Sequence, residues 1–263
     1  MDTFANYILD EKNLSSKMEI IYYLSKKQNI FFDKSVILKT ELARLFIKYN
    51  KIDVDENLVL TACLLCNCKK MEDTMNLEKI KTYAKQGSEY LELLGFDKKF
   101  RRICLEMNRY NDGEIREKES DVLELVDQFG GMIIDRPDRT AFNPEEAMVV
   151  LKYINFKNKY NRYVESFSEF VDNMLDINMG EFVEIDALKR LSKMYNETND
   201  IPEFIKNIVN NYQNQIDKLM AKKYNEIKKE MFEDEKNLRP LFTEETTRKI
   251  IGDIEKSNYL VIE

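Results

Sequence analysis

The stretch LVLTACLLCNCKK, from Leu58 to Lys70, decides how this chain folds. It is apolar on nearly every side over most of its length, and a helix of that kind belongs at the centre of a bundle. A second stretch, SDVLELVDQFGGMIIDRPDR over residues 120–139, predicts another apolar helix followed by a turn. We expect these two segments to form the middle of the fold.

Composition and helix signals predict an all-α protein. Seven Gly and four Pro among 263 residues are too few to punctuate a many-stranded sheet. The expected N-terminal caps are a capping box of Ser16 and Glu19, then Asp33, Asp97 and Asn143, and a further helix is expected to begin at Asp121. Gly95 is expected to close a helix in the left-handed conformation, and the longest helix is expected over Pro202–Asn237.

Histidine is absent from the chain. His is the usual general base near neutral pH and a common ligand for zinc, copper and iron, so its absence excludes catalytic triads, His-ligated metal centres and His phosphorelay. The net charge of −7 argues against nucleic acid as a partner. No apolar run is long enough to cross a membrane and no leader pattern opens the sequence, so we expect a cytoplasmic protein. We also expect no cofactor.

Two compact groups of side chains have alternative interpretations. The four cysteines are either buried structural thiols or a soft-metal site. Three of them, Cys63, Cys66 and Cys68, are crowded on one helix, and this spacing favours buried thiols over a metal site completed by Cys104. The basic run of Lys98, Lys99, Arg101 and Arg102 forms either an anion site or a solvated helix face, and we favour the solvated face.

Four segments in the same order resemble the HD-GYP family of bacterial metal-dependent phosphodiesterases that cleave cyclic di-GMP. TACLLCNCKK resembles the family's AALLHDIGK, and IKTYAKQGSEYLELLGF resembles its IKxHPxxGxxxLxxLGF segment. LEMNRYNDG and LVDQFGGMIIDRPDRTAFNPEEAMVVL resemble the two segments that follow in the family. The resemblance implies an HD-like helical domain over residues 33–155 and does not reach residues 156–263. The helical pattern of the remaining residues predicts N-terminal helices over 1–32 that pack on this domain and a helical extension over 156–263.

The residues that would hold metal in this family are nearly all replaced. The positions that match the family's histidines and its paired Asp are Leu38, Cys66, Asn67, Tyr83, Glu106 and Met107. One metal-site Asp is kept, as Asp127, and we expect it to pair with Lys70 or an Arg. The resemblance also matches Lys70, Arg136 and Arg139 to conserved basic residues, which are candidate ligand-binding residues here. The two arginines more readily tie their turn to nearby carbonyls and acids.

One carboxylate cannot hold the metals that activate water in this family. The leading expectation is therefore a catalytically inactive, regulatory or scaffolding module that binds a protein partner or a second copy of itself. One alternative is an active hydrolase with Asp127, Glu106 and Asp112 as unusual ligands. The other is a receptor that binds cyclic di-GMP without cleaving it, through Lys70 and Arg136.

Overall fold

The computed structural model describes residues 3–70, 77–107, 116–136, 139–157, 161–175 and 187–221. The chain divides into two compact units, Met1–Gln215 and Ile216–Glu263. In the second unit the described residues, 216–221, are helical. The first unit contains every other described residue.

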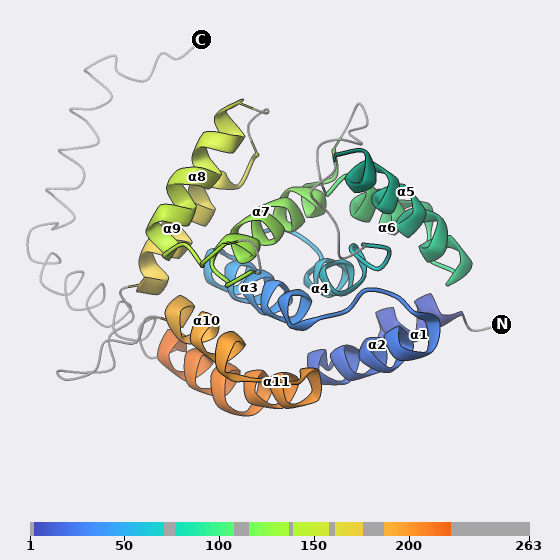
Figure 1. Ribbon diagram of the computed structural model, residues 1–263, viewed down its shortest axis with the longest axis horizontal. Coiled ribbons are helices and arrows are strands. Elements are labelled where there is room, and N and C mark those ends of the chain that lie inside the picture. Colours follow the sequence, from blue (N-terminus) through green and yellow to red (C-terminus); the bar gives the residue numbers. More distant parts are fainter. Residues whose placement is uncertain are drawn as a thin grey trace, which may run out of the picture. The chain divides into compact units, whose positions relative to one another are not determined.

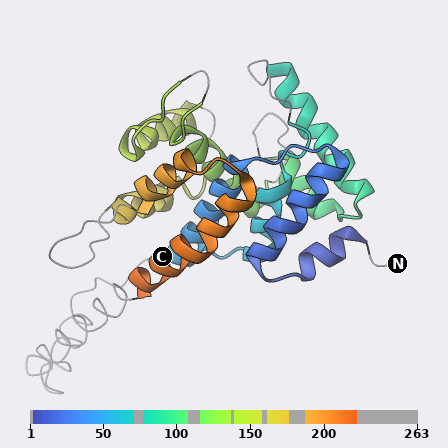
Figure 2. The same ribbon diagram turned by 60° about the horizontal axis from the view of Figure 1, so that its bottom comes forward.

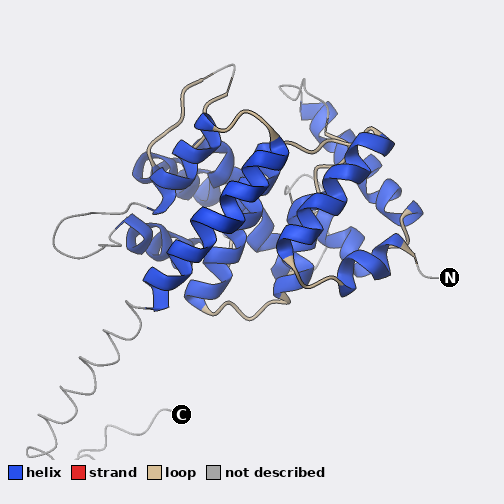
Figure 3. Ribbon diagram, turned by 90° about the horizontal axis from the view of Figure 1, so that it is seen from below, coloured by secondary structure: helices blue, strands red, loops and turns tan. Residues whose placement is uncertain are grey.

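All regular elements among the described residues are helices (Figure 3), apart from an isolated bridge between Arg136 and Arg139. This confirms the all-α prediction. The elements are α1 (Phe4–Asp10), α2 (Leu14–Gln28), α3 (Lys34–Asn50), α4 (Glu56–Leu65), α5 (Leu77–Leu93), α6 (Lys98–Leu105), α7 (Lys118–Met132), α8 (Pro144–Lys157), α9 (Val164–Leu175), α10 (Ala187–Glu197), α11 (Ile201–Asn207) and the π-helix η2 (Ile208–Gln213). None of the described helices is long and apolar enough to cross a membrane.

Helix α3 lies at the centre of the unit. Every residue from Ser35 to Ile47 is buried, because α3 packs against α4, α7, α9, α10 and α11 (Figure 1). The turned view in Figure 2 shows α11, in orange, lying over α3. The ring of Phe46 on α3 contacts the rings of Phe167 and Phe170 on α9, with centroids 4.9 and 5.5 Å away. The segment 58–65, expected at the centre, forms most of α4 and is the neighbour of α3.

Several expected helix ends are confirmed. The side chains of Asp33 and Asp97 accept hydrogen bonds from backbone N–H groups three residues later. The Asn143 side chain accepts from the Glu146 N–H at 2.8 Å, while the Glu146 carboxylate accepts from the Asn143 N–H at 3.2 Å. Gly95 has a φ of 90°, the left-handed conformation expected after α5.

Other helix bounds differ from the expectation. The capping box at Ser16 is wrong, because Asn13 caps α2 and its side chain accepts from the Ser16 N–H at 3.0 Å. An Asn three residues earlier offers the same kind of acceptor, and the helix begins there instead. Helix α7 likewise begins at Lys118, three residues before the expected Asp121, without a side-chain cap.

The C-terminal helices belong to the same compact unit as the helices before residue 155. The sequence suggested a boundary there, but α9, α10 and α11 all pack on α3, and the unit continues to Gln215. The long helix expected from Pro202 begins at Ile201 under an Asp200 cap and is interrupted by η2. Its expected end, Asn237, lies outside the described residues.

Helix α2 carries a buried lysine. Lys17 is 1% exposed, and its ammonium donates to the hydroxyl of Thr61 on α4 at 2.5 Å. Burial and the charge of Lys12 lower the pKa of Lys17 from 10.5 to about 8, although Glu11 and Asp55 oppose the shift. The fold therefore disfavours the charged form of this side chain.

Replacement of Lys17 by Met should raise the free energy of unfolding at neutral pH by about 1–3 kcal/mol, because Met needs no desolvation of a charge. The folded-state pKa of about 8 lies below the unfolded value of 10.5. The folded protein thus binds fewer protons within that window, and wild-type stability rises with pH across it. Urea unfolding of both proteins should show the advantage of Lys17→Met shrinking between pH 8 and 10.5. The exposed Lys26→Met is the control, and an advantage that stays constant with pH would contradict the assignment.

Candidate functional site

The carboxylate of Asp127 meets two side chains from other parts of the fold. The Lys39 ammonium of α3 donates to Asp127 Oδ1 at 2.7 Å, and the Asn67 side-chain amide donates to the same oxygen at 3.1 Å. The Lys39 side chain is 9% exposed and that of Asp127 is 30% exposed. The carboxylate therefore remains partly open to solvent, with a buried cation held against it.

The local sequence explains how these three residues meet. Asn67 lies in the turns after α4, where the Lys70 N–H donates to its carbonyl at 2.8 Å. The Phe31 N–H donates to the Cys68 carbonyl at 2.9 Å, which ties this turn to the segment before α3. On α7, Gly130 lies one turn after Asp127, and a Cβ built there would lie 2.8 Å from Lys39 Cγ. The glycine therefore lets the lysine stem cross α7 on its way to the carboxylate.

Replacement of Gly130 by Ala should lower the free energy of unfolding by about 1–3 kcal/mol, because its methyl group would push the buried Lys39 stem and meet Leu38 Cδ2 at 3.4 Å. Gly131 is the matched control, since a Cβ there meets nothing within 4 Å. Gly131→Ala should raise stability by up to about 1 kcal/mol through helix propensity. Thermal and urea unfolding measure both changes, and equal effects of the two substitutions would refute the close approach.

Positive charge outweighs negative charge around Asp127. Burial alone would raise the pKa of the Asp127 carboxyl, but Lys39 and Lys70, with hydrogen bonds from Lys39 and Asn67, lower it below 3.8. Burial, Lys39 and Arg136 lower the pKa of Lys70, against the carboxylates of Asp127 and Asp33. Among the described residues Lys70 has no hydrogen-bond acceptor for its ammonium, which lies 5.3 Å from the Phe31 ring centroid.

The residues at this site do not fit a metal ion. The Lys39 ammonium already pairs with Asp127 Oδ1, and the nearby positive charge of Lys70 would repel a cation. Cys66 is buried, and burial raises the pKa of its thiol above its ordinary value. The described residues contain no group of three or more His, Cys, Asp or Glu placed to hold a metal.

The four cysteines are buried thiols. Burial raises the pKa of Cys63, Cys66 and Cys104 well above the ordinary value, and that of Cys68 to about 12. All four are free. Their protonated, solvent-protected state agrees with the structural interpretation and disfavours redox sensing by Cys66 or Cys68.

The other positions matched to the family's metal site make no printed hydrogen bond or ion pair with Asp127. Leu38 is buried beside Gly130, and Tyr83 is buried on α5, one turn before Gly87. Glu106 and Met107 lie at the end of α6, where the Glu106 carboxylate pairs with Arg102 at 2.6 Å. Asp112, the other ligand of the hydrolase alternative, lies outside the described residues.

Glu106 and Met107 belong to a second polar cluster, built around Arg116. This guanidinium donates to the backbone carbonyls of Glu106 and Met107 and pairs with Asp121 at 2.5 Å and with Glu124 at 3.4 Å. The side chains of the two acids are 4% and 3% exposed. Arg116 could not be recognised from the sequence, because nothing in its local pattern distinguishes it from a surface arginine.

In the turn after α7, the side chain of Arg139 stabilises the backbone. The Arg139 guanidinium donates to the Met132 carbonyl at 3.0 Å, the Thr140 carbonyl at 3.2 Å and the Gly131 carbonyl. Arg136 and Arg139 also exchange backbone hydrogen bonds at 2.9 and 3.2 Å. Arg139 is therefore a structural residue of the turn, whereas Arg136 is exposed near Lys70.

The basic run on α6 is largely paired. Arg101 pairs with Glu92 at 2.6 Å, Arg102 with Glu106 at 2.6 Å, and Lys99 lies 3.5 Å from Glu119. These acids occupy the positions that an anion would need. The arrangement favours the solvated helix face, with ion pairs on it, over an anion site.

Comparisons of the chain with protein-family models, curated proteins and solved structures find no match.

Proposed function

We propose that this protein is a catalytically inactive, HD-GYP-like regulatory module that acts by binding. The observation that carries the proposal is the Lys39 ammonium, 2.7 Å from the only carboxylate retained at the matched metal positions. An ammonium there supplies the positive charge that the Asp127 carboxylate requires, but it cannot lower the pKa of a water molecule as a metal does. The Asn67 side-chain amide donates a second hydrogen bond to the same oxygen, at 3.1 Å.

Metal analysis of the purified protein, together with an assay on cyclic dinucleotides, tests this proposal. We expect no stoichiometric iron or manganese and no turnover, even after incubation with either metal. Bound metal with turnover that is lost in Asp127→Asn would refute the proposal and favour the hydrolase alternative. Supplying both metals in the assay ensures that a missing ion does not explain a negative result.

The partner in this proposal is a protein, either a different chain or a second copy of this one. Light scattering after gel filtration gives the molecular mass and separates the two arrangements. A mass near 31.3 kDa corresponds to a monomer that binds another protein. Twice that mass corresponds to a homodimer.

A receptor that binds a cyclic dinucleotide without cleaving it is the second candidate. It is favoured by one observation, the Lys70 ammonium, which has no hydrogen-bond acceptor among the described residues and has Arg136 nearby. Burial, and then the charges of Lys39 and Arg136, lower the pKa of Lys70, and a ligand phosphate would offset those charges. Calorimetry with cyclic di-GMP should then give micromolar binding that is lost in Lys70→Ala and in Arg136→Ala, with Lys69→Ala as the control. An absence of heat would eliminate this candidate.

A further inference from the structure

The exposed face of α8 carries neighbouring apolar side chains. Among the described residues six large apolar side chains are exposed, and three of them lie on α8 or directly before it: Phe142, Val149 and Tyr153. Val149 and Tyr153 lie one helical turn apart and are 71% and 58% exposed. The opposite face, which includes Ala147 and Leu151, is buried, and α8 packs on α7 and α9 (Figure 1). Neighbouring apolar side chains on one exposed face indicate a contact surface more strongly than scattered single ones do.

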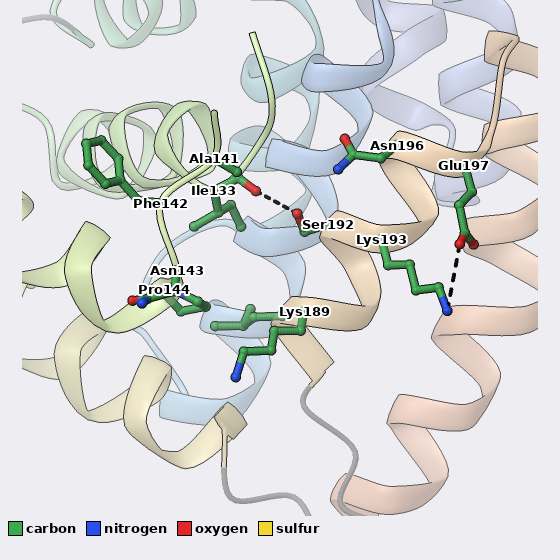
Figure 4. A pocket seen from close by; sticks show the side chains of 11 residues that line it. Ile133, Ala141, Phe142, Asn143, Pro144, Lys189, Ser192, Lys193, Asn196 and Glu197 are labelled. Atoms are coloured by element: carbon green, nitrogen blue, oxygen red, sulfur yellow. Dashed lines mark hydrogen bonds and ion pairs between the residues drawn. The ribbon is translucent and has the colours of Figure 1, made fainter. Parts of the chain in front are cut away.

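The hollow beside this helix offers less exposed apolar surface. It has a volume of about 520 Å³ and lies between the turn that precedes α8 and helix α10 (Figure 4). Ile133 and Leu188, two of its apolar lining residues, are buried. The exposed apolar surface in this part of the fold is therefore on α8.

Charged residues flank Val149 on the same face of α8. Glu145 lies four residues before Val149 and Lys152 lies three residues after it, and these spacings place all three on one face of a helix. All three side chains are exposed. The face therefore runs from a negative end, through an apolar centre, to a positive end.

This order of charges complements itself when two copies of α8 lie antiparallel. A two-fold axis beside Val149 brings the Val149 side chains of the two copies together. The same axis places Glu145 of each copy opposite Lys152 of the other, which forms two ion pairs. A parallel arrangement would instead place Glu145 beside Glu145 and Lys152 beside Lys152, and like charges repel. The charges thus favour a symmetric contact between identical surfaces.

Lys152 can make this contact at little cost within its own chain. Its ammonium lies 3.8 Å from Glu165 Oε2 on α9, and the two side chains are 45% and 68% exposed. Solvent weakens an ion pair of that kind, so Lys152 can exchange Glu165 for a second copy. Helix α8 has 14 residues and is about 21 Å long. The contact is therefore short, and we expect a dissociation constant in the micromolar range.

We propose that the exposed face of α8 is a homodimer contact, in which two copies of the helix pack antiparallel about Val149. The inference rests on the proposed function, in which the protein acts by binding a protein partner, and it identifies that partner as a second copy of the chain. Val149 and Tyr153 supply the apolar surface. Glu145 and Lys152 fix the direction and the register of the two helices.

Light scattering after gel filtration, over protein concentrations that span the micromolar range, tests the proposal. We expect the mass to rise with concentration from 31.3 kDa towards twice that value. Val149→Glu places two negative charges together at the two-fold axis and should weaken the dimer by about tenfold or more. The matched control is Leu93→Glu on α5, which makes the same change in charge at a side chain that is 84% exposed. Its dissociation constant should stay within about twofold of the wild type.

Charge exchange tests the antiparallel register. Glu145→Lys and Lys152→Glu should each weaken the dimer by about threefold or more, because each places like charges together. The double variant Glu145→Lys/Lys152→Glu should bind within about twofold of the wild type, because it restores opposite charges across the contact. The restoration cannot arise within one chain, because residues seven apart lie about 10.5 Å apart along a helix.

Three outcomes would each overturn the proposal: a mass that stays at 31.3 kDa at every concentration, a dimer that Val149→Glu leaves unchanged, or a double variant as weak as the single ones. A monomer would leave the proposed function in place, with a different protein as the partner. Bound metal with turnover would refute the proposed function whatever the mass. Circular dichroism of every variant checks that its helical content is intact.

Discussion

Replacement of Arg116 by Met is expected to lower the free energy of unfolding by about 3–5 kcal/mol, a larger loss than we expect for Lys39 or Gly130. The guanidinium is 11% exposed and serves the buried carboxylates of Asp121 and Glu124. It also donates to the Ser120 carbonyl at 3.1 Å. Without it, two buried negative charges lose a shared partner, and several backbone carbonyls lose a donor.

Urea unfolding followed by circular dichroism measures this change. Arg162→Met is the matched control, since Arg162 also pairs with Asp121 at 2.5 Å but its side chain is 46% exposed. Its loss should cost about 1 kcal/mol or less, because solvent screens an exposed charge. If the two arginine variants proved equally stable, burial would not determine the strength of this cluster.

Replacement of Lys39 by Met should lower the free energy of unfolding by about 2–4 kcal/mol, because the Asp127 carboxylate keeps its charge but loses its ion pair. Asn67 continues to donate to the carboxylate, so the loss should be smaller than that for Arg116. Met fills the space of the lysine stem, which separates the effect of the charge from that of a cavity.

A double-mutant cycle isolates the pair. Adding Asp127→Asn to Lys39→Met removes the unpaired charge and should recover part of the loss, with a coupling energy of at least about 1 kcal/mol. The folded-state pKa of Asp127 is lowered, so the contribution of the pair is present above pH 3.8 and is lost as pH falls through the lower folded-state value. Wild-type stability should therefore fall more steeply in that acidic window than that of Lys39→Met. Additive single effects would show that Asp127 and Lys39 do not act as a pair.

Features set by a few neighbouring residues could be predicted from the sequence. Asp33, Asp97 and Asn143 cap helices as expected because a cap needs only a side-chain oxygen and three following residues. Gly95 adopts its left-handed conformation for an equally local reason. Asn13 and Ser16 are both suitable N-caps for α2, and the sequence alone did not show that the helix begins after Asn13.

Features that depend on distant contacts could not be predicted. The sequence indicated that Asp127 needs a cationic partner, but it suggested Lys70 or an Arg, whereas the hydrogen-bonded partner is Lys39. A lysine within the apolar pattern of α3 was the available signal, and its meaning depended on how α3 crosses α7 at Gly130. The π-helix η2 was not expected from the sequence either, and its residues contact distant parts of the chain. Tyr212 donates to the Ala187 carbonyl and Gln213 donates to the Glu41 carboxylate.

The burial of α3 has a consequence for how the protein is made. The Glu41 carboxylate on α3 is fully buried and accepts a hydrogen bond from Gln213, 172 residues later. Synthesis proceeds from the N-terminus, so the helix at the centre of the unit emerges early from the ribosome, and its last covering segments emerge much later. Until then its apolar surface is exposed to water and to chaperones. A chain that stopped near residue 155 would keep that surface uncovered, and ribosome-bound intermediates of this protein should become resistant to protease only after η2 has left the exit tunnel.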